Sequence, residues 1–391
     1  MDISIYFEPV HLKGALRFVR GNRKRMGDLV TVYERPGDFP EISGNHIALI
    51  GVMDDRDAVG NEGCGRAPDY ARSEFYKLFP SNGNIRLVDL GNIPPGNTPN
   101  DTYFALSAAM SEVMARNAVP VVIGGGQNLT YGMYRGYEKI GRIINLACID
   151  PLFDLGDTEG ELNSLSYLGK VIMHQPNFLF NYTNIGYQSY LIDRESLSLM
   201  RNLFFDVYRL GDAQADMEGT EPLVRNADLI SVDIGAVRAS DAPGNANAQP
   251  NGFYGEELCR ITRYAGLSDK VSSLGFFEYN PALDLQNRTA RLIAEAIWYF
   301  IDGFYSRQQD YPREESGEYI KFNVKLEELE EQLTFFKSKK SDRWWMKVPF
   351  RTKNVAKYER HHMVPCSHRD YEMAMSNNLP DRWWMTYQKL M

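Results

Sequence analysis

Short apolar runs alternate with longer stretches of helical periodicity between about residues 45 and 306 of the chain. Each run is four to eight residues long, is rich in Val, Ile and Leu, and is followed by Gly, Asp or Pro. The clearest runs cover residues 47–53, 119–124, 143–150, 229–233 and 271–277. Continuous apolar runs of this length are typical of parallel strands that are buried on both faces. The pattern predicts an α/β domain with a mostly parallel sheet.

Two helices are predicted with this sheet. Residues 101–118 carry apolar side chains at helical spacing, and we expect Asp101 to cap the first turn. Residues 289–304 are apolar around most of the helix, which predicts that this helix is buried. Because helices that alternate with parallel strands cover both faces of the sheet, we expect a three-layer α/β/α architecture.

The character of the sequence changes after residue 306. Residues 314–331 are acidic and predict a helix, whereas residues 334–360 hold nine Lys or Arg against two Asp or Glu. The acidic helix can neutralise this basic segment, so docking within the chain is favoured over nucleic-acid binding. We divide the chain into an N-terminal extension (1–44), an α/β domain (45–306) and a C-terminal extension (307–391).

The pentapeptide DRWWM occurs twice in the C-terminal extension, at 342–346 and 381–385. Tryptophans beside arginine are typical of the residues that dominate protein interfaces. The extension is therefore expected to bind a protein partner, or a second copy of the chain, through Trp344, Trp345, Trp383 and Trp384.

Composition narrows the class of protein. The chain has 391 residues, 43% hydrophobic and 24% charged, with a formal net charge of −8, which is typical of a folded protein and disfavours a general nucleic-acid binder. Its four cysteines form no CxxC pair, which suits a reducing compartment. No secretory signal and no apolar run near eighteen residues is visible, so we expect a cytoplasmic protein without a membrane span.

Polar side chains follow three of the predicted strands. Gln127 comes after the second strand, Asp150 and Asp154 after the third, and Asp233 ends the fourth. The carboxyl ends of parallel strands meet at one edge of a sheet, where ligands bind. Oxygen ligands of this kind suit Mg²⁺, Ca²⁺ or Mn²⁺, although aspartates at strand ends also serve as caps and turn formers.

Five motifs occur in an order that resembles the ureohydrolase family of arginase, agmatinase and formimidoylglutamase. They are IALIGVMDDRDAVGNEGCGRAPDYAR, PVVIGGGQNLT, NLACIDPLFD, LISVDIGAVRASDAP and SLGFFEYNPALD. The resemblance implies the arginase fold. It also implies a centre of two Mn ions, held by two His and four Asp, whose bridging hydroxide attacks a guanidinium or imine carbon. Glu278 matches the acid that binds the guanidinium of the substrate.

This chain departs from the family pattern at the metal ligands. Gln127 and Leu152 stand where the resemblance implies the two histidines, Gly235 stands in place of one aspartate, and the Asp before the first His is Gly126. No histidine occurs in residues 161–170, where a substrate-side His is expected. We therefore expect no bound cofactor and no two-ion centre. One ion on Asp150, Asp154 and Asp233 stays an alternative; without an ion, repulsion should raise a pKa or recruit a cation such as Arg238.

These departures favour a catalytically degenerate, formimidoylglutamase-like protein that acts as a binding or scaffold subunit and self-associates or binds a partner through its C-terminal extension. The first alternative is a hydrolase of C–N bonds in amidino or formimino compounds with an altered metal site. There Glu278 would hold the cation, and Asp150 or Asp233 would act as base. The second alternative is a sensor of a cationic guanidino metabolite.

Three smaller motifs have plain structural interpretations. The run 124–126 lacks the spacing of phosphate-binding loops, so we expect a tight turn. Cys64 and Cys148 are expected to be buried without a catalytic role. A zinc site remains open for His361, His362, Cys366 and His368, although their spacing does not match a paired-ligand motif.

Overall fold

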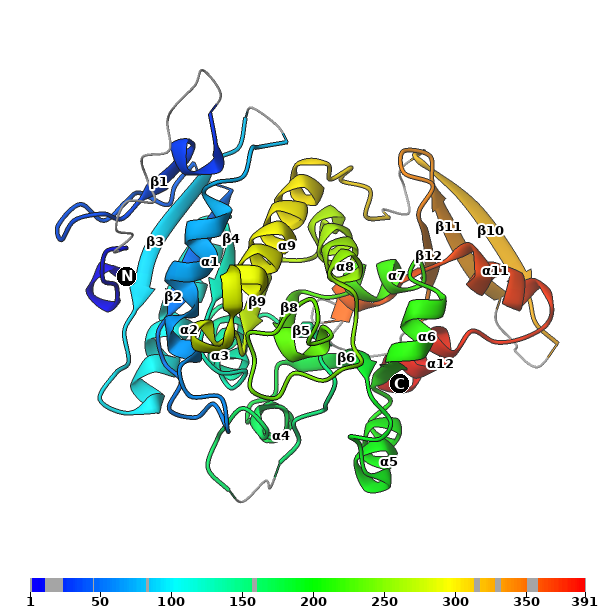
Figure 1. Cartoon of the computed structure of the whole chain (residues 1–391). Helices are drawn as coiled ribbons and strands as arrows, with labels where there is room; N and C mark the ends of the chain where they lie inside the picture. The colour runs from blue at the N-terminus through cyan, green and yellow to red at the C-terminus, as the bar shows by residue number, and fades with distance from the viewer. Residues whose placement is uncertain are drawn as a thin grey trace.

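A nine-stranded parallel sheet forms the centre of the chain in the computed structural model, which describes residues 2–10, 24–44, 46–81, 84–156, 160–312, 317–327, 332–349 and 358–390 (Figure 1). The strand order is β1-β3-β2-β4-β9-β8-β5-β6-β7. The strands are β1 Val30–Val32, β2 Ile47–Val52, β3 Leu87–Ile93, β4 Val119–Ile123, β5 Ile144–Ile149, β6 Leu179–Tyr187, β7 Asp206–Arg209, β8 Leu229–Asp233 and β9 Ser273–Phe277. The five predicted strands are confirmed to within two residues.

Four strands were not predicted, because polar side chains interrupt their apolar runs. In β3, Asp89 is fully buried, and Arg72 of helix α1 (Ala67–Phe75) satisfies it with two hydrogen bonds of 2.6 and 3.0 Å. In β6, Asn181, Thr183 and Asn184 are all buried. A buried polar group with a partner costs little, so these strands form without an apolar signature.

Helices cover both faces of the sheet, which confirms the three-layer α/β/α architecture. Alternate residues of β2 point to opposite layers: Ile47 and Leu49 pack in the layer of α1, α8 and α9, whereas Ala48 and Ile50 pack in the layer of α2 and α3. The helices are α1 Ala67–Phe75, α2 Pro99–Ala115, α3 Leu129–Lys139, α4 Tyr167–Met173, α5 Arg194–Asn202, α6 Leu210–Ala215, α7 Thr220–Arg225, α8 Gly255–Leu267 and α9 Arg288–Tyr305.

The two predicted helices correspond to α2 and α9. Helix α9 is buried along most of its length, as predicted. The expected cap of α2 is three residues too late: Thr98 is the N-cap, Pro99 occupies the first turn, and the Asp101 carboxylate accepts the Thr98 backbone N–H at 2.8 Å. Asp101 thus takes the third position of a capping box.

The C-terminal extension forms a second, antiparallel sheet, seen beside the main domain in Figure 1. Its elements are β10 Tyr319–Lys325, β11 Gln332–Ser338, β12 Trp344–Lys347, β13 Met363–Cys366, α11 His368–Met375 and α12 Asp381–Leu390. The helix predicted over 314–331 is wrong for 319–325, because this segment pairs with all seven residues of β11. Residues 314–316 and 328–331 lie outside the described part of the chain.

The extension packs on the main domain through arginine side chains. Arg225 of α7 donates to the backbone oxygens of Trp344 (3.1 Å) and Cys366 (3.3 Å), and its guanidinium lies 4.3 Å from the ring centre of Trp345. Arg360 pairs with Asp228 of the main domain at 2.6 Å. Among the described cations of the basic segment, Arg343 also pairs with the main domain, whereas Lys337 and Lys340 pair with acids of the extension itself. The segment is therefore neutralised within the chain.

Three of the four tryptophans expected to bind a partner lie inside the extension. Trp344, Trp345 and Trp383 are only 8%, 2% and 3% exposed, so they are not available as a contact surface, whereas Trp384 is 43% exposed. Among the described residues, none of the helices combines the length and apolar character that crossing a bilayer requires.

Candidate functional site

Five of the predicted site residues meet at one edge of the sheet. Strands β4, β9, β8 and β5 are neighbours, and their carboxyl ends deliver Gln127, Glu278, Asp233 and the pair Asp150 and Asp154. Asp150, Gln127, Glu278 and Asp154 are all buried, whereas Asp233 is partly exposed. The sequence-based expectation of a carboxylate cluster at this edge agrees with the structure.

One oxygen of each central aspartate bonds to the local backbone. Asp150 Oδ1 accepts the Leu152 N–H at 2.7 Å, and Asp233 Oδ1 accepts the Gly235 N–H at 2.6 Å. Each of these two aspartates therefore stabilises the turn that follows its strand. Asp150 Oδ2 is buried and has no donor among the described residues unless the neighbouring carboxyl of Asp154 carries a proton.

Burial raises the pKa values of the clustered acids, and for Asp154, Asp233 and Glu278 the charges of neighbouring acids add to this effect. Burial raises the pKa of Asp150 to about 6 and that of Glu278 to about 7. For Asp154, burial and then the charges of Asp150 and Asp233 raise the pKa well above its usual range. The expected mutual repulsion is thus present.

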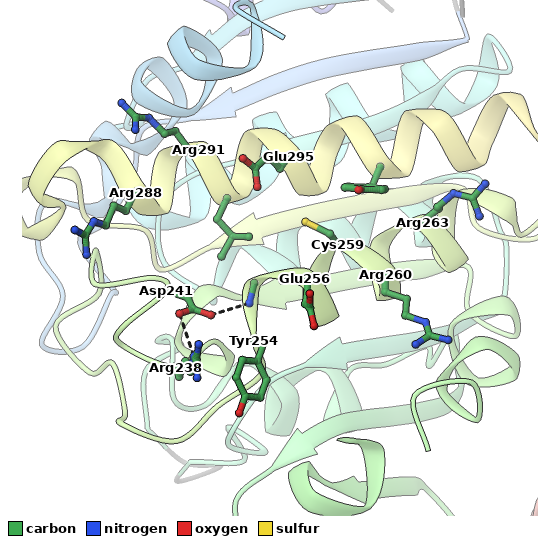
Figure 2. Close-up of a pocket in the computed structure, with 13 residues that line it drawn as sticks. Arg238, Asp241, Tyr254, Glu256, Cys259, Arg260, Arg263, Arg288, Arg291 and Glu295 are labelled. Carbon is green, nitrogen blue, oxygen red and sulfur yellow. Dashed lines mark hydrogen bonds and ion pairs between the residues drawn. The ribbon is translucent and has the colours of Figure 1, made fainter. Parts of the chain in front are cut away.

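Arg238 does not compensate the acid cluster. Its Nε lies 3.0 Å from Asp241, and its guanidinium lies 3.8 Å from the ring centre of Tyr254. Figure 2 shows Arg238 beside these two side chains. No cation is among the causes of the raised pKa values of Asp154 and Asp233. The suggestion that Arg238 balances the aspartates is wrong, because an acid of its own loop already binds it.

Glu278 is held in position by groups from two other strand ends. Asn61 Nδ2 donates to Glu278 Oε2 at 2.7 Å and to its backbone oxygen at 2.9 Å, while the Gln127 N–H donates to Oε1 at 2.8 Å. Asn61 Oδ1 in turn accepts the Ala246 N–H at 3.1 Å. Sequence reasoning missed Asn61; its only signal was its place in the glycine-rich segment after the first predicted strand.

Two of the acids have unusual backbone conformations. Glu278 and Asp154 have φ of +62° and +50°, a region that residues with a side chain seldom occupy. Such conformations persist where the surroundings enforce them and are concentrated at functional sites. The neighbouring turn at Gly124 and Gly125 is equally constrained, because a Cβ on Gly125 would lie 2.3 Å from the Asp54 oxygen. The expectation of a tight turn in this run is confirmed.

The donor set does not fit a centre of two metal ions. Leu152 has no lone pair to donate, Gly235 has no side chain, and Gln127 offers only an amide in place of an imidazole. Within the described ranges, no three His, Cys, Asp or Glu side chains are arranged to hold a metal ion, so the single-ion alternative on Asp150, Asp154 and Asp233 gains no geometric support. The buried acids lower their mutual repulsion by taking up protons instead.

The histidines and cysteines noted in the sequence lie apart. His361 stacks on Phe180 with ring centres 4.2 Å apart, and His368 pairs with Glu372 at 3.3 Å on an exposed turn of α11. Cys64 and Cys148 are fully buried, as expected. These side chains have ordinary packing roles.

A parallel sheet between two helical layers, with carboxylates gathered beyond the ends of β5, β8 and β9, defines an α/β/α protein of the ureohydrolase class. The Arginase family is matched over residues 45–302, about two thirds of the chain. The chain belongs to the arginase family.

Curated relatives in this family are formimidoylglutamases. The chain is 27% identical over 283 residues to the formimidoylglutamase of Streptococcus pyogenes serotype M5, covering 66% of this chain and 84% of that protein. It is 25% identical over 295 residues to the formimidoylglutamase of Photorhabdus laumondii, covering 70% and 91%.

Solved structures share the fold. A crystal structure of Trypanosoma cruzi formiminoglutamase with Mn²⁺ has a TM-score of 0.65 at 19% identity, and the match covers 73% of this chain and all of that one. The formimidoylglutamase of Bacillus subtilis also has a TM-score of 0.65, at 18% identity, with 73% of this chain and 93% of that one covered. The family match ends at residue 302, shortly before the C-terminal extension (307–391) begins.

Proposed function

We propose that this arginase-family chain is a hydrolase of C–N bonds in formimino or amidino compounds, of the formimidoylglutamase type, with an altered centre. The observation that carries the proposal is the pair of buried carboxylates, Glu278 and Asp154, in left-handed backbone at the edge where the family binds its substrate. Strain of about 1–3 kcal/mol at each position would be an unnecessary cost for residues that served only as caps.

The chemistry follows from two of these acids. A cationic formimino group fits against Glu278, whose carboxylate Asn61 and the Gln127 N–H hold in a fixed orientation. Asp150 takes a proton from water, and the water oxygen bonds to the formimino carbon. The C–N bond to the amine then breaks, and the proton on Asp150 passes to the departing nitrogen. A base whose pKa is about 6 is mostly ionised at neutral pH and suits this transfer.

No step of this reaction is assigned to a metal ion, because Gln127, Leu152 and Gly235 replace three of the six donors that a two-ion centre needs. Turnover is therefore expected to survive treatment with a chelator. The scaffold interpretation loses its proposed contact surface, since three of the four tryptophans that it assigned to a partner are buried within the extension.

A second candidate function is binding of the same compounds without turnover, as a sensor. The replaced ligand positions favour it, because the groups that generate a metal-bound nucleophile in the family are missing. It shares with the first proposal the fit of a cation to Glu278 and differs only in the fate of the C–N bond.

One experiment tests both proposals. The purified chain is incubated with N-formimidoyl-L-glutamate, and glutamate release and ligand binding are measured, with Glu278→Gln and Asp150→Asn as variants. Release that both variants abolish and a chelator leaves intact supports the hydrolase. Saturable binding without release, lost in Glu278→Gln, supports the sensor. No binding and no release would contradict both.

A further inference from the structure

A small cavity of about 20 Å³ lies where α7 of the main domain meets strands β12 and β13 of the extension (Figure 1). Six of its ten lining residues lie between positions 310 and 365, beyond the part of the chain that the Arginase family matches. Its lining residues Arg225 and Lys270 precede β8 and β9, whereas the acid cluster follows these strands. The cavity and the acid cluster are therefore at opposite edges of the sheet.

Arg225 has two unused N–H donors at this cavity. Its Nε donates to Glu221 at 2.8 Å, and its Nη2 donates to the backbone oxygens of Trp344 (3.1 Å) and Cys366 (3.3 Å). Nη1 is buried and has no hydrogen-bond partner among the described residues. A guanidinium has five N–H donors, so the two hydrogens of Nη1 lack an acceptor although the side chain is only 4% exposed.

Another unused donor comes from the extension. Tyr311 lines the cavity, and its hydroxyl is buried without a hydrogen-bond partner among the residues that the structure describes. Burial raises the pKa of Tyr311 to about 12, so the hydroxyl keeps its proton at neutral pH. Because buried donors in native proteins nearly always have a partner, Arg225 and Tyr311 require an acceptor between the two parts of the chain.

Positive charge is in excess around the cavity. In the part of the chain that the structure describes, four cations share three carboxylates in the ion pairs Arg225–Glu221 (2.8 Å), Arg343–Glu221 (3.3 Å), Arg343–Asp310 (3.6 Å), Arg360–Asp228 (2.6 Å) and Lys270–Asp228 (4.0 Å). The remaining carboxylate of the lining, Asp269, acts on the charge of Arg307. At neutral pH, which is below the lowered pKa of Lys270 of about 8, one positive charge is thus left without a counter-charge.

We propose that this cavity binds one small monovalent anion, chloride, between Arg225 of the main domain and Tyr311 of the extension. An anion accepts from both donors and supplies the missing negative charge, whereas a water molecule supplies no charge. The volume holds one particle of about the size of a water molecule, which excludes organic acids. Docking of the extension then depends on the chloride concentration, and this dependence is independent of the proposed hydrolase or sensor function.

Urea unfolding of the full chain, followed by tryptophan fluorescence at pH 7, tests the anion site. Chloride is raised from about 20 to about 200 mM at constant ionic strength, with gluconate, which is too large for the cavity, as the balancing anion. Because only the folded chain has the site, the ratio of folded to unfolded chain should rise by up to about tenfold. An unchanged ratio would overturn the proposal.

Tyr311→Phe removes the hydroxyl donor and keeps the ring, so this variant should fold, and its rise should be less than about threefold. Tyr319→Phe is the matched control. The Tyr319 hydroxyl donates to the backbone oxygen of Tyr311 at 3.1 Å, but Tyr319 does not line this cavity, so its variant should keep the full rise. A full rise in Tyr311→Phe as well would show a general effect of the salt on unfolding and would exclude the site.

Crystals soaked in bromide give a direct measurement. Bromide is a slightly larger halide, and its anomalous scattering distinguishes it from water. We expect one bromide within hydrogen-bond distance of Arg225 Nη1 and of the Tyr311 hydroxyl. A water molecule at this position, without an anomalous signal, would show that the cavity selects no anion and that the proposal is wrong.

Discussion

At the scale of single residues, the orientation of Glu278 depends on Asn61. Replacing the Asn61 amide by the isosteric carboxylate of Asn61→Asp would put an acid at 2.7 Å from Glu278 Oε2 in place of a donor. Two carboxyls at this distance cannot both ionise, so Glu278 would take up a proton and lose its attraction for a cation. We expect formamidine binding, measured by calorimetry, to weaken by about tenfold or more.

Asn247→Asp is the control for this prediction, because it adds one negative charge near the site without contact to Glu278. Asn247 is bonded to Val59 O at 3.4 Å and to Asn245 Oδ1 at 2.6 Å. This variant should bind formamidine at least as well as the unchanged chain. Equal weakening in both variants would show that added charge alone, and not the orientation of Glu278, decides binding.

The residue scale also shows what the sequence can predict. Asp150, Asp154, Asp233 and Glu278 were predictable because each comes directly after a run of strand residues and belongs to an ordered motif. Asn61 was not, because its role arises from a contact with a residue 217 positions away.

At the scale of elements, the two DRWWM segments adopt different structures. The first forms strand β12, where Trp344 and Trp345 face opposite sides and join different apolar clusters. The second begins helix α12, which buries Trp383 and leaves Trp384 exposed. Local propensity is the same in both copies, so the pairing of β12 with β11 and β13 decides the difference.

This difference gives a paired prediction for stability. Trp345→Ala removes a ring that is 2% exposed and lies under the Arg225 guanidinium, so the free energy of unfolding of the extension should fall by about 3–5 kcal/mol. Trp384→Ala removes a ring that is 43% exposed and should change it by less than about 1 kcal/mol. Denaturant unfolding followed by tryptophan fluorescence measures both.

Similar losses in the two variants would mean that both tryptophans contribute equally to the packed core, which would contradict their different burial.

The element scale also explains the wrong helix prediction over 319–325. YIKFNVK carries helix-compatible lysines, but its apolar residues recur at every second position, and its neighbour β11 supplies the hydrogen bonds.

At the scale of the whole molecule, buried cations join the extension to the main domain. Lys270 is 8% exposed, with Nζ at 3.1 Å from Asn226 Oδ1 and 3.5 Å from the backbone oxygen of Arg360. Burial lowers its pKa to about 8, and Arg360 adds to this effect while Asp228 opposes it. The folded chain therefore binds the Lys270 proton more weakly than the unfolded chain does.

The sign of the pH dependence follows from this lowered pKa. Between pH 8 and about 10.5 the unfolded chain still binds the proton that folded Lys270 has released, so the free energy of unfolding rises with pH. Below pH 8 both states are protonated and the contribution is constant. Relative to Lys270→Met, the unchanged chain should gain stability from pH 8 to about 9.5 at up to about 1.4 kcal/mol per pH unit.

Denaturant unfolding at several pH values measures this difference. The limit near pH 9.5 avoids the ionisation of tyrosines in the unfolded chain. Lys340→Met is the control, because this lysine is 39% exposed and pairs only with the surface residue Glu318. Parallel stability profiles for the unchanged chain and Lys270→Met would contradict the prediction.

The docking of the extension has a consequence for biosynthesis. A ribosome releases the main domain first, and domains commonly fold in the order of synthesis. Until residues 344–366 emerge, Arg225 has Glu221 and Asp228 has the Asn145 N–H, but each lacks the further partner that the extension supplies. The nascent main domain therefore exposes the surface around Arg225 and Asp228, and the last fifth of the chain later covers it. A message truncated after α9 would yield a product that chaperones and proteases recognise, although every strand of the large sheet is present.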